Sequence, residues 1–508
     1  MSSLLDLQMH WYTAVAVAVV LYIIGGIVYR LHFSPIAKFP GPRLAAATVL
    51  YEVYYDVIKQ GQYTFKIQEL HKTYGPIVRI SPHELHIDDP EYYEELMSRN
   101  SPRDKYKYYV DQFGIPGASF STIDHRMHRL RRAPMNPLFS KQSIFRLEPM
   151  VQRLVEKLCS RIDEFKKSGQ PMPVRLAYQA LTTDVVTAYA LNKSWHHLDS
   201  PDFSPEWVAT VKATADMGNL VKQVPWLISF FNVLPDFVIE AVFPGMLLLI
   251  NWRRSLARHI QEIIDTQDKL EENEHGLPST IFHSLLQSNV PEEEKSLQRL
   301  VEEGQLVVGA GADTTAHALT QTTFHVLDNP KVLAKLQQEL QKAMPDPSES
   351  AILSIVENLP YLSAIVNEGL RLSYGLPTRL ARISPNAPLH FQDWTIPAGT
   401  PVGMTSVMMH HNERIFPNSH TFLPERWSEQ PDGGRALEKY LVSFSKGSRQ
   451  CIGINLAKAE LFLTLATIFR RYEPSLFDAV RERDVDLKHD NFLPQPSLQS
   501  RPIRVVFR

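Results

Sequence analysis

The sequence contains very little cysteine, with only Cys159 and Cys451 in 508 residues. Two cysteines cannot build a disulfide framework, and they cannot supply the four thiolates of a structural zinc site or an iron–sulfur cluster. The chain also lacks an excess of charge of either sign, because 53 basic residues are balanced by 55 acidic ones. Proteins that bind nucleic acid usually carry a strongly basic surface. The composition therefore gives no reason to expect a nucleic-acid partner.

Internal repeats and long low-complexity tracts are absent too. With 44% hydrophobic residues the chain can bury a large core, and length alone suggests about three domains. Apolar residues recur mostly at helical spacing, and short alternating stretches indicate a minor sheet. We expect strands over residues 77–80, 84–87, 389–394 and 503–507, and helices over 64–74, 300–327, 331–344, 361–372 and most of 143–301, with breaks at Pro171, Pro205, Pro225, Pro235 and Pro244.

Residues 11–29 contain no charged side chain and are rich in valine, alanine, isoleucine and leucine. Their number matches a bilayer-spanning helix and exceeds the apolar core of a signal peptide, about 7–15 residues. Basic residues follow this run, which predicts that the remaining chain stays in the cytoplasm. We expect a short segment over 1–10, an anchor over 11–29, a basic and proline-rich hinge over 30–45 and the main body over 46–508. A cleaved signal or a buried helix is the alternative.

Cys451 lies in an unusual local frame. Phe444 and Gly447 precede it, Arg449 comes two residues before it, and Gly453 two residues after it. Glycine lets a backbone approach a neighbour closely, arginine can neutralise an anion, and an aromatic ring can shield a sulfur from water. The frame therefore suits a thiolate that meets a bulky planar cofactor. The alternative is a buried structural cysteine, which is how we interpret Cys159 on its apolar helical pattern.

A second site candidate lies inside the predicted helix 300–327, where Ala310-Gly311-Ala312-Asp313-Thr314 interrupts the apolar pattern. Helix interiors disfavour glycine, and aspartate and threonine compete there for backbone hydrogen bonds. The small residues would leave room for a flat group, and Asp313 with Thr314 could relay protons. Taken alone, the segment is explained better as a helix kink with solvent-facing polar residues.

Two further patterns are common in proteins of any function, and they indicate a site only together with the two candidates above. Glu368 and Arg371 lie three residues apart on one helical face, which usually means a weak surface pair, but Arg426 downstream could complete a buried ionic triad. His128-Arg129-Leu130-Arg131-Arg132 concentrates positive charge, which usually means a solvated face or a patch for an acidic partner.

Together these motifs resemble the cytochrome P-450 superfamily of haem-thiolate monooxygenases, in its membrane-anchored microsomal type. The resemblance covers essentially the whole chain, and the style is similar to that of filamentous-fungal members acting in secondary metabolism. It implies a mainly α fold, a single helical prism with a minor β region over 46–508, preceded by one transmembrane helix. This single domain replaces the three domains that the length of the chain alone suggests.

The resemblance also implies roles for the site residues. Cys451 would be the axial ligand of the iron of haem b (iron protoporphyrin IX), within the loop of Phe444, Gly447, Arg449 and Gly453. Asp313 and Thr314 would deliver protons to reduced O2, and Glu368, Arg371 and Arg426 would form the structural triad. Arg449, Arg132 and Arg382 would bind the haem propionates. The family usually has tryptophan four residues before the arginine matched by Arg132; here His128 takes that position, and its imidazole can still donate a hydrogen bond.

The activity that the resemblance implies is insertion of one oxygen atom of O2 into an apolar small molecule, at the endoplasmic reticulum membrane and on its cytoplasmic side. Electrons would come from NADPH–haemoprotein reductase, with cytochrome b5 as an optional second donor. The substrate pocket is expected from residues 109–121, 217–231, 305–312, 376–381 and 491–497, by analogy with the family. Two alternatives stay open: a haem-thiolate isomerase or dehydratase that uses no O2, and a non-catalytic haem protein.

Overall fold

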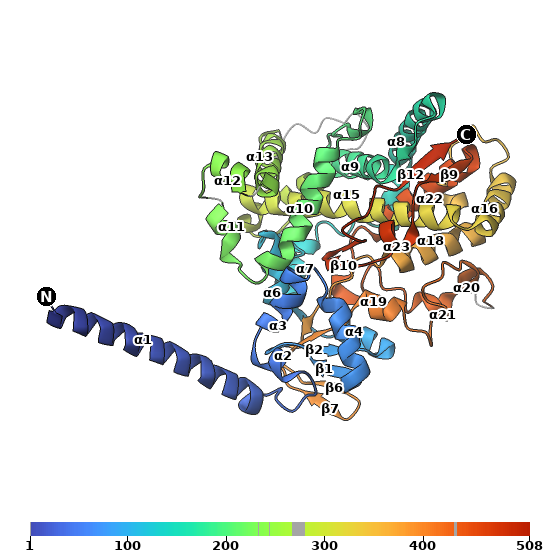
Figure 1. Cartoon of the computed structure of the whole chain (residues 1–508). Coiled ribbons are helices and arrows are strands. Elements are labelled where there is room, and N and C mark those ends of the chain that lie inside the picture. The colour runs from blue at the N-terminus through green and yellow to red at the C-terminus, as the bar shows by residue number, and fades with distance from the viewer. Residues whose placement is uncertain (1, 232, 243, 267–279, 431–433) are drawn as a thin grey trace.

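The computed structural model describes residues 2–231, 233–242, 244–266, 280–430 and 434–508. Helix α1 (Ser2–Val28) projects away from the rest of the chain (Figure 1), and a π-helical turn (Tyr29–Phe33) continues it. The apolar run Gln8–Phe33 has a mean hydropathy of 2.2 over its most apolar window, and none of that window is buried by protein. Such a helix is long and apolar enough to cross a bilayer. It is longer than the predicted 11–29.

The chain between α1 and the body is folded onto the body. Ile36 and Phe39 are buried, and the ring of Phe39 stacks on Trp394 with their centroids 4.9 Å apart. Arg79 donates from its guanidinium to the carbonyl oxygen of Arg30 at 2.9 Å. The hinge is therefore a packed connection, which limits the directions in which α1 can leave the body.

The body is built around α15 (Leu297–Leu327), which crosses its middle in Figure 1. The largest apolar core joins α15 to α8 (Lys141–Ser168), α9 (Val174–Leu191), α18 (Pro360–Ser373) and α22 (Ile454–Arg471). Helices α10 (Pro205–Val221), α13 (Pro244–Asp265) and α16 (Pro330–Ala343) flank this core and begin at prolines. Proline suits a first helical position because its missing N–H has no partner there.

The shorter helices lie mostly in connections. They are α2 (Arg43–Ala47), α3 (Leu50–Val53), α4 (Tyr63–Tyr74), α5 (Tyr93–Leu96), α6 (Lys107–Val110), α7 (His125–Arg132), α11 (Trp226–Phe231), α12 (Asp236–Val242), α14 (Ile281–Leu286), α17 (Leu353–Val356), α19 (Ser406–His410), α20 (Glu425–Ser428), α21 (Arg435–Glu438) and α23 (Arg481–Asp484). The predicted helices 64–74, 300–327, 331–344 and 361–372 are confirmed as α4, α15, α16 and α18.

A five-stranded sheet has the order β1-β2-β8-β5-β3. Its first pair, β1 (Ile77–Arg79) and β2 (Leu85–Ile87), is the predicted hairpin. Strands β8 (Pro401–Gly403) and β5 (Arg382–Ile383) connect it to β3 (Asp104–Lys105). In the register of the last pair, Lys105 lies opposite Arg382. Two like charges facing each other across a strand pair are destabilising unless an anion lies between them.

The remaining strands form smaller sheets. One has the order β4 (Met172–Pro173), β12 (Arg504–Phe507) and β9 (Pro474–Phe477), and the other two are the hairpins β6 (Leu389–Phe391)–β7 (Trp394–Ile396) and β10 (His489–Asn491)–β11 (Leu493–Gln495). The predicted strand over 503–507 is confirmed, whereas residues 389–394 contain one strand and the turn that leads into its partner.

Candidate active site

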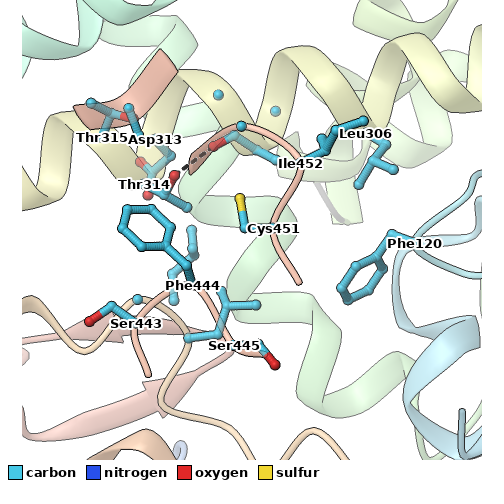
Figure 2. Close-up of a pocket in the computed structure, with 18 of the residues that line it drawn as sticks. Phe120, Leu306, Asp313, Thr314, Thr315, Ser443, Phe444, Ser445, Cys451 and Ile452 are labelled. Atoms are coloured by element: carbon cyan, nitrogen blue, oxygen red, sulfur yellow. Dashed lines mark hydrogen bonds between the residues drawn. The ribbon is translucent and has the colours of Figure 1, made fainter. Parts of the chain in front are cut away.

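A cavity of about 340 Å³ lies between α15 and the loop of residues 443–453, and Cys451 lies in its wall. Figure 2 shows the sulfur pointing across this space toward α15, with Phe444 beside it and Phe120 on the other side. The loop is closed by the backbone N–H of Cys451, which donates to the carbonyl oxygen of Phe444 at 2.9 Å. Cys451 is therefore open to the cavity although it lies inside the molecule.

The two glycines of this loop differ in the space that surrounds them. Gly447 has φ +75°, and a Cβ there would lie 1.5 Å from the carbonyl oxygen of Met97, so no other residue fits. At Gly453 a Cβ would meet only the sulfur of Cys451, at 4.0 Å, which is an ordinary contact. Among the described residues, therefore, no neighbouring protein atom requires glycine at 453.

The thiol of Cys451 lies near the first turn of α22, which begins at Ile454. Burial raises its pKa, while the backbone N–H of Gly453 and the charge of Arg132 act in the opposite direction. A helix N-terminus and a nearby cation both favour a thiolate. Cys159 differs: it lies in the apolar core, burial raises its pKa to about 11, and it is inert by its surroundings.

Four basic side chains from four parts of the chain line the same cavity: Lys105, Arg132, Arg382 and Arg449. Within the described part of the chain, none of these four forms an ion pair with a carboxylate. Burial, reinforced by the charge of Arg382, lowers the pKa of Arg449 to about 9, and burial lowers that of Arg382 to about 10. Buried cations without counter-ions are costly, so the cluster fits a ligand with two negative groups. The two propionates of a haem meet that requirement.

The basic side chains of α7 lie on two faces of the helix, one toward the cavity and one toward solvent. His128 is 3% exposed and Arg132 faces the cavity, whereas Arg126 and Arg129 point into solvent. Burial first, then the charge of Arg449, lowers the pKa of His128 to about 2, so its ring is neutral. Its Nδ1 has no hydrogen-bond partner among the described residues. His128 can therefore serve as a hydrogen-bonding group beside the cations without adding charge.

On the opposite wall, α15 presents Ala310 and Thr314. The hydroxyl of Thr314 donates to the carbonyl oxygen of Ala310 at 2.8 Å, and Figure 2 shows Thr314 across the cavity from Cys451. Gly311 serves mainly the packing of helices, because a Cβ there would lie 2.8 Å from Val186 on α9. Ala312 is fully buried, and its carbonyl oxygen accepts from Thr182 at 2.6 Å. Ala310 and Gly311 both line the cavity, whereas Ala312 serves only the close contact with α9.

Asp313 is 6% exposed and lies next to Thr314, but its carboxylate is bound by Arg175 of α9. The guanidinium of Arg175 contacts Oδ1 at 2.5 Å and also donates to the carbonyl oxygen of Asp313 at 3.2 Å. No motif in the sequence marks Arg175, because it is 138 residues distant and lies on a different helix.

The structure brings Glu368 and Arg371 of α18 together with Arg426 of α20, and all three are at most 7% exposed. Arg371 binds Glu368 through two bonds of 2.8 and 2.9 Å, and Arg426 adds a third of 3.0 Å. Arg371 also donates to the carbonyl oxygens of His410 and Ser419, while Trp427 donates to Glu368. Every strong donor and acceptor is paired, so the cluster connects α18 to the segment 410–427 that precedes the cysteine loop.

The expected pocket stretches are only partly those that line the cavity. Residues from 109–121, 305–312, 376–381 and 491–497 contribute, among them Phe113, Phe120 and Phe492. None of the residues 217–231 belongs to the wall; α10 contributes Val211, Thr214 and Ala215 instead. Lys105 also lines the cavity, and no motif in the sequence marks it, because its place there depends on its pairing with Arg382.

A cysteine facing a cavity, a cluster of buried cations and a polar interruption in the opposite helix fit a protein that binds haem. The family model for cytochrome P450 matches residues 42–501. The chain belongs to the cytochrome P450 family and is an oxidoreductase with a haem-iron cofactor, dependent on O2 and on a redox partner.

Similar proteins come from filamentous fungi. The chain is 54% identical to cytochrome P450 monooxygenase MO6277 of Ascocoryne sarcoides, over 96% of this chain and 97% of that protein. It is 42% identical to tryptophan 6-hydroxylase fscE of Fusarium equiseti and 42% identical to N-acetyltryptophan 6-hydroxylase ivoC of Emericella nidulans, in each case over 94% of this chain and 93% of the relative. These relatives confirm the resemblance to fungal monooxygenases of secondary metabolism, and α1 fits a membrane anchor.

Proposed function

We propose that this chain is a membrane-anchored haem b monooxygenase that oxidises an apolar small molecule, an intermediate of secondary metabolism. The observation that carries the proposal is the convergence on one cavity of Cys451, Thr314 and four cations that form no ion pair within the described part of the chain. When bound through a thiolate, haem supplies an electron-rich iron that favours cleavage of the O–O bond of O2. The names of two relatives, which hydroxylate tryptophan and N-acetyltryptophan, support hydroxylation as the reaction.

The residues around the cavity would hold the cofactor. Cys451 would bind the iron, and the ring of Phe444 would keep water from the sulfur. Arg132, Arg382 and Arg449 would bind the propionates, with Lys105 beside Arg382 and the neutral His128 as a further hydrogen-bond donor. Gly447 fixes the loop, and Gly453 leaves the space above the sulfur open.

Proton delivery would fall to Thr314 and Asp313. The Thr314 hydroxyl donates to Ala310 within its own helix, so rotation about its Cα–Cβ bond can redirect that proton into the cavity. Asp313 directly precedes it on α15, where its carboxyl, once protonated, would replace the proton that Thr314 gives up. Arg175 binds the carboxylate, so transfer from Asp313 requires that ion pair to open.

The N-terminal helix and the surface of the body would place this site at a membrane and beside its electron donor. We infer a short segment 1–10, a transmembrane anchor 11–29, a hinge 30–45 and one catalytic domain 46–508, on the cytoplasmic side of the endoplasmic reticulum. NADPH–haemoprotein reductase would dock on the face of Arg126 and Arg129, with cytochrome b5 as an optional second donor. Glu368, Arg371 and Arg426 would hold the cysteine loop in place.

The test is the spectrum of the reduced, carbon-monoxide-treated chain in membranes. We expect a thiolate-shifted Soret band in the wild type and in Cys159→Ala, and its loss in Cys451→Ala. A band that survives in Cys451→Ala would overturn the ligand assignment. Its absence from folded, haem-loaded wild type would overturn thiolate ligation altogether.

A further inference from the structure

Three phenylalanine rings meet at one end of the cavity, and they come from three separate segments. Phe113 ends a 3-10 turn (Asp111–Phe113), Phe120 lies in the loop before α7, and Phe492 forms the tip of the β10–β11 hairpin. Phe492 stands nearly perpendicular to both others, with its centroid 4.7 Å from that of Phe113 and 5.8 Å from that of Phe120. All three rings are partly exposed and line the cavity.

The rings are held by the backbone and by charges around them. Phe492 has φ +67°, and its N–H donates to the carboxylate of Asp490 at 3.1 Å. That carboxylate also accepts from Thr64 at 2.5 Å, which fixes the hairpin tip on α4. Phe120 is fixed by Lys105, whose ammonium lies 3.4 Å from the ring centroid and donates to the carbonyl oxygen of Phe120. The arrangement is therefore formed before a ligand arrives.

Aromatic rings have a negative face and a positive edge, so they bind another ring in edge-to-face or offset geometry. Each such pair strengthens binding by roughly 2- to 12-fold beyond the burial of apolar area. A saturated ligand of the same size buries a similar apolar area but cannot form these ring–ring interactions. Other aromatic side chains, such as Trp252 and Phe444, line the cavity singly, whereas Phe113, Phe120 and Phe492 are the rings that contact one another there.

The propionates are expected to take up the charge of the cation cluster, to which Lys105 belongs. Glu303 binds Arg299 at 2.7 Å and accepts from Ser119 at 2.6 Å. Burial raises the pKa of Glu460 well above its ordinary value, so this carboxyl carries no charge. Burial lowers the pKa of His317 to about 3, so this ring is neutral. An ionised group on the ligand would therefore lose its hydration without gaining an opposite charge.

We propose that Phe113, Phe120 and Phe492 form an aromatic clamp that binds an uncharged planar ring of the substrate and thereby selects aromatic substrates over saturated ones. The inference names a substrate class for the proposed monooxygenase and rests on that function. The three residues are specificity-determining, because they contact the substrate and take no part in proton transfer.

The experiment compares naphthalene with decalin, which share one carbon skeleton, on the haem-loaded chain. Affinity is measured from the shift of the Soret band on titration, so no turnover is needed. We expect the wild type to bind naphthalene at least about 5-fold tighter than decalin, by the aromatic term above. Phe492→Leu and Phe113→Leu should each weaken naphthalene by about 3- to 10-fold and leave decalin within about 2-fold.

Controls separate the clamp from folding and from the cofactor. Phe492→Tyr keeps the ring and should keep the preference, and Phe477→Leu changes an exposed ring outside the cavity wall. Equal weakening of both ligands, or no preference in the wild type, would overturn the clamp. The carbon-monoxide spectrum is recorded on every variant, so loss of the thiolate band in the wild type is recognised separately as failure of the proposed function.

A second pair of ligands, one neutral and one charged, tests whether the site prefers an uncharged ring. Naphthalene should bind at least about 10-fold tighter than 2-naphthoate, because the carboxylate loses its hydration in the cavity while the cations are taken up by the haem propionates. Tighter binding of 2-naphthoate would overturn the uncharged class and would point to Lys105 as its partner.

Discussion

Arg175 on α9 binds Asp313 on α15, with 2.5 Å between the guanidinium nitrogen and Oδ1. The carboxylate that is proposed to supply protons is therefore held by a neighbouring helix and is almost completely buried. Its contact with Arg175 couples the site to the packing of α9 against α15, which Gly311 and Thr182 also maintain.

This pair is expected to stabilise the fold measurably. In a double-mutant cycle of Arg175→Met and Asp313→Asn, we expect a coupling of about 1–3 kcal/mol from urea unfolding in detergent, since a largely buried pair is poorly screened. The matched control is Arg254–Asp236, a pair of similar length (2.7 Å) whose side chains are at least half exposed. It should give about 0.5 kcal/mol or less. Equal coupling in the two cycles would refute the importance of burial.

Thr314→Ala should separate electron use from product formation. Without the hydroxyl the proton relay loses its last donor, so we expect hydrogen peroxide to be released and product per NADPH to fall by about 10-fold. This is less than the roughly 100- to 10,000-fold of full general acid catalysis, because water can replace part of the relay. The assay follows NADPH, peroxide and product together. Thr320→Ala is the control, because its hydroxyl makes the same kind of helical bond, to Ala316 at 2.7 Å, away from the cavity. Unchanged coupling in Thr314→Ala would remove it from the mechanism.

Arg129→Glu should slow electron transfer without disturbing the cofactor. Arg129 is exposed on α7, whereas Arg132 of the same helix faces the cavity. We expect reduction by the reductase to slow by about 3- to 10-fold at low salt, with a smaller difference at high salt. Stopped-flow reduction under carbon monoxide measures the rate. Lys167→Glu, at the far end of the 28-residue α8, is the control, and an equal effect there would contradict docking at α7.

A second buried ionic cluster joins the N-terminal segment to α10. Lys222 contacts Glu52 at 3.1 Å and Asp56 at 2.5 Å, and Arg379 contacts Glu52 at 2.7 Å and Glu84 at 3.3 Å. Burial is the largest cause that raises the pKa of Glu84, to about 7, while Arg379 opposes it. Tyr109 donates to the same carboxylate at 3.2 Å.

Glu84 should therefore make stability depend on pH. Between its ordinary pKa of 4.5 and its folded pKa of about 7, the folded chain keeps a proton that the unfolded chain has lost. Stability from this group is present below the lower value and is lost as the pH rises through the upper one. Glu84→Gln removes that loss, so its unfolding free energy relative to wild type should rise by about 2 kcal/mol from about pH 5 to about pH 8.

Urea unfolding in detergent at the two pH values measures this difference. Glu69→Gln is the control, because that side chain is 63% exposed and should show the same difference at both values. A pH-independent difference for Glu84→Gln would contradict the raised pKa.

The local motifs were sufficient for the parts of the site that lie within one segment. Phe444, Gly447 and Cys451 share a single loop, and Asp313 and Thr314 share one helical turn, so their spacing along the chain fixes their spacing in the fold. Helix α15 and the β1–β2 hairpin were predictable for the same reason, because periodicity reports local structure. The packing partners of these motifs were not predictable: Gly311 has to be small because Val186 of a different helix lies against it.

The sequence by itself determined the fold class, the apolar N-terminal helix, the family and the cysteine proposed as the thiolate ligand, because each depends on contiguous patterns. Only the tertiary structure decided which cations surround the cofactor site, since Lys105 meets Arg382 through strand register and Arg449 through the cysteine loop. It alone decided that Arg175 binds Asp313 and that three phenylalanines meet at the end of the cavity. The physical reason is that burial and electrostatics depend on distances between segments, which no spacing along the chain encodes.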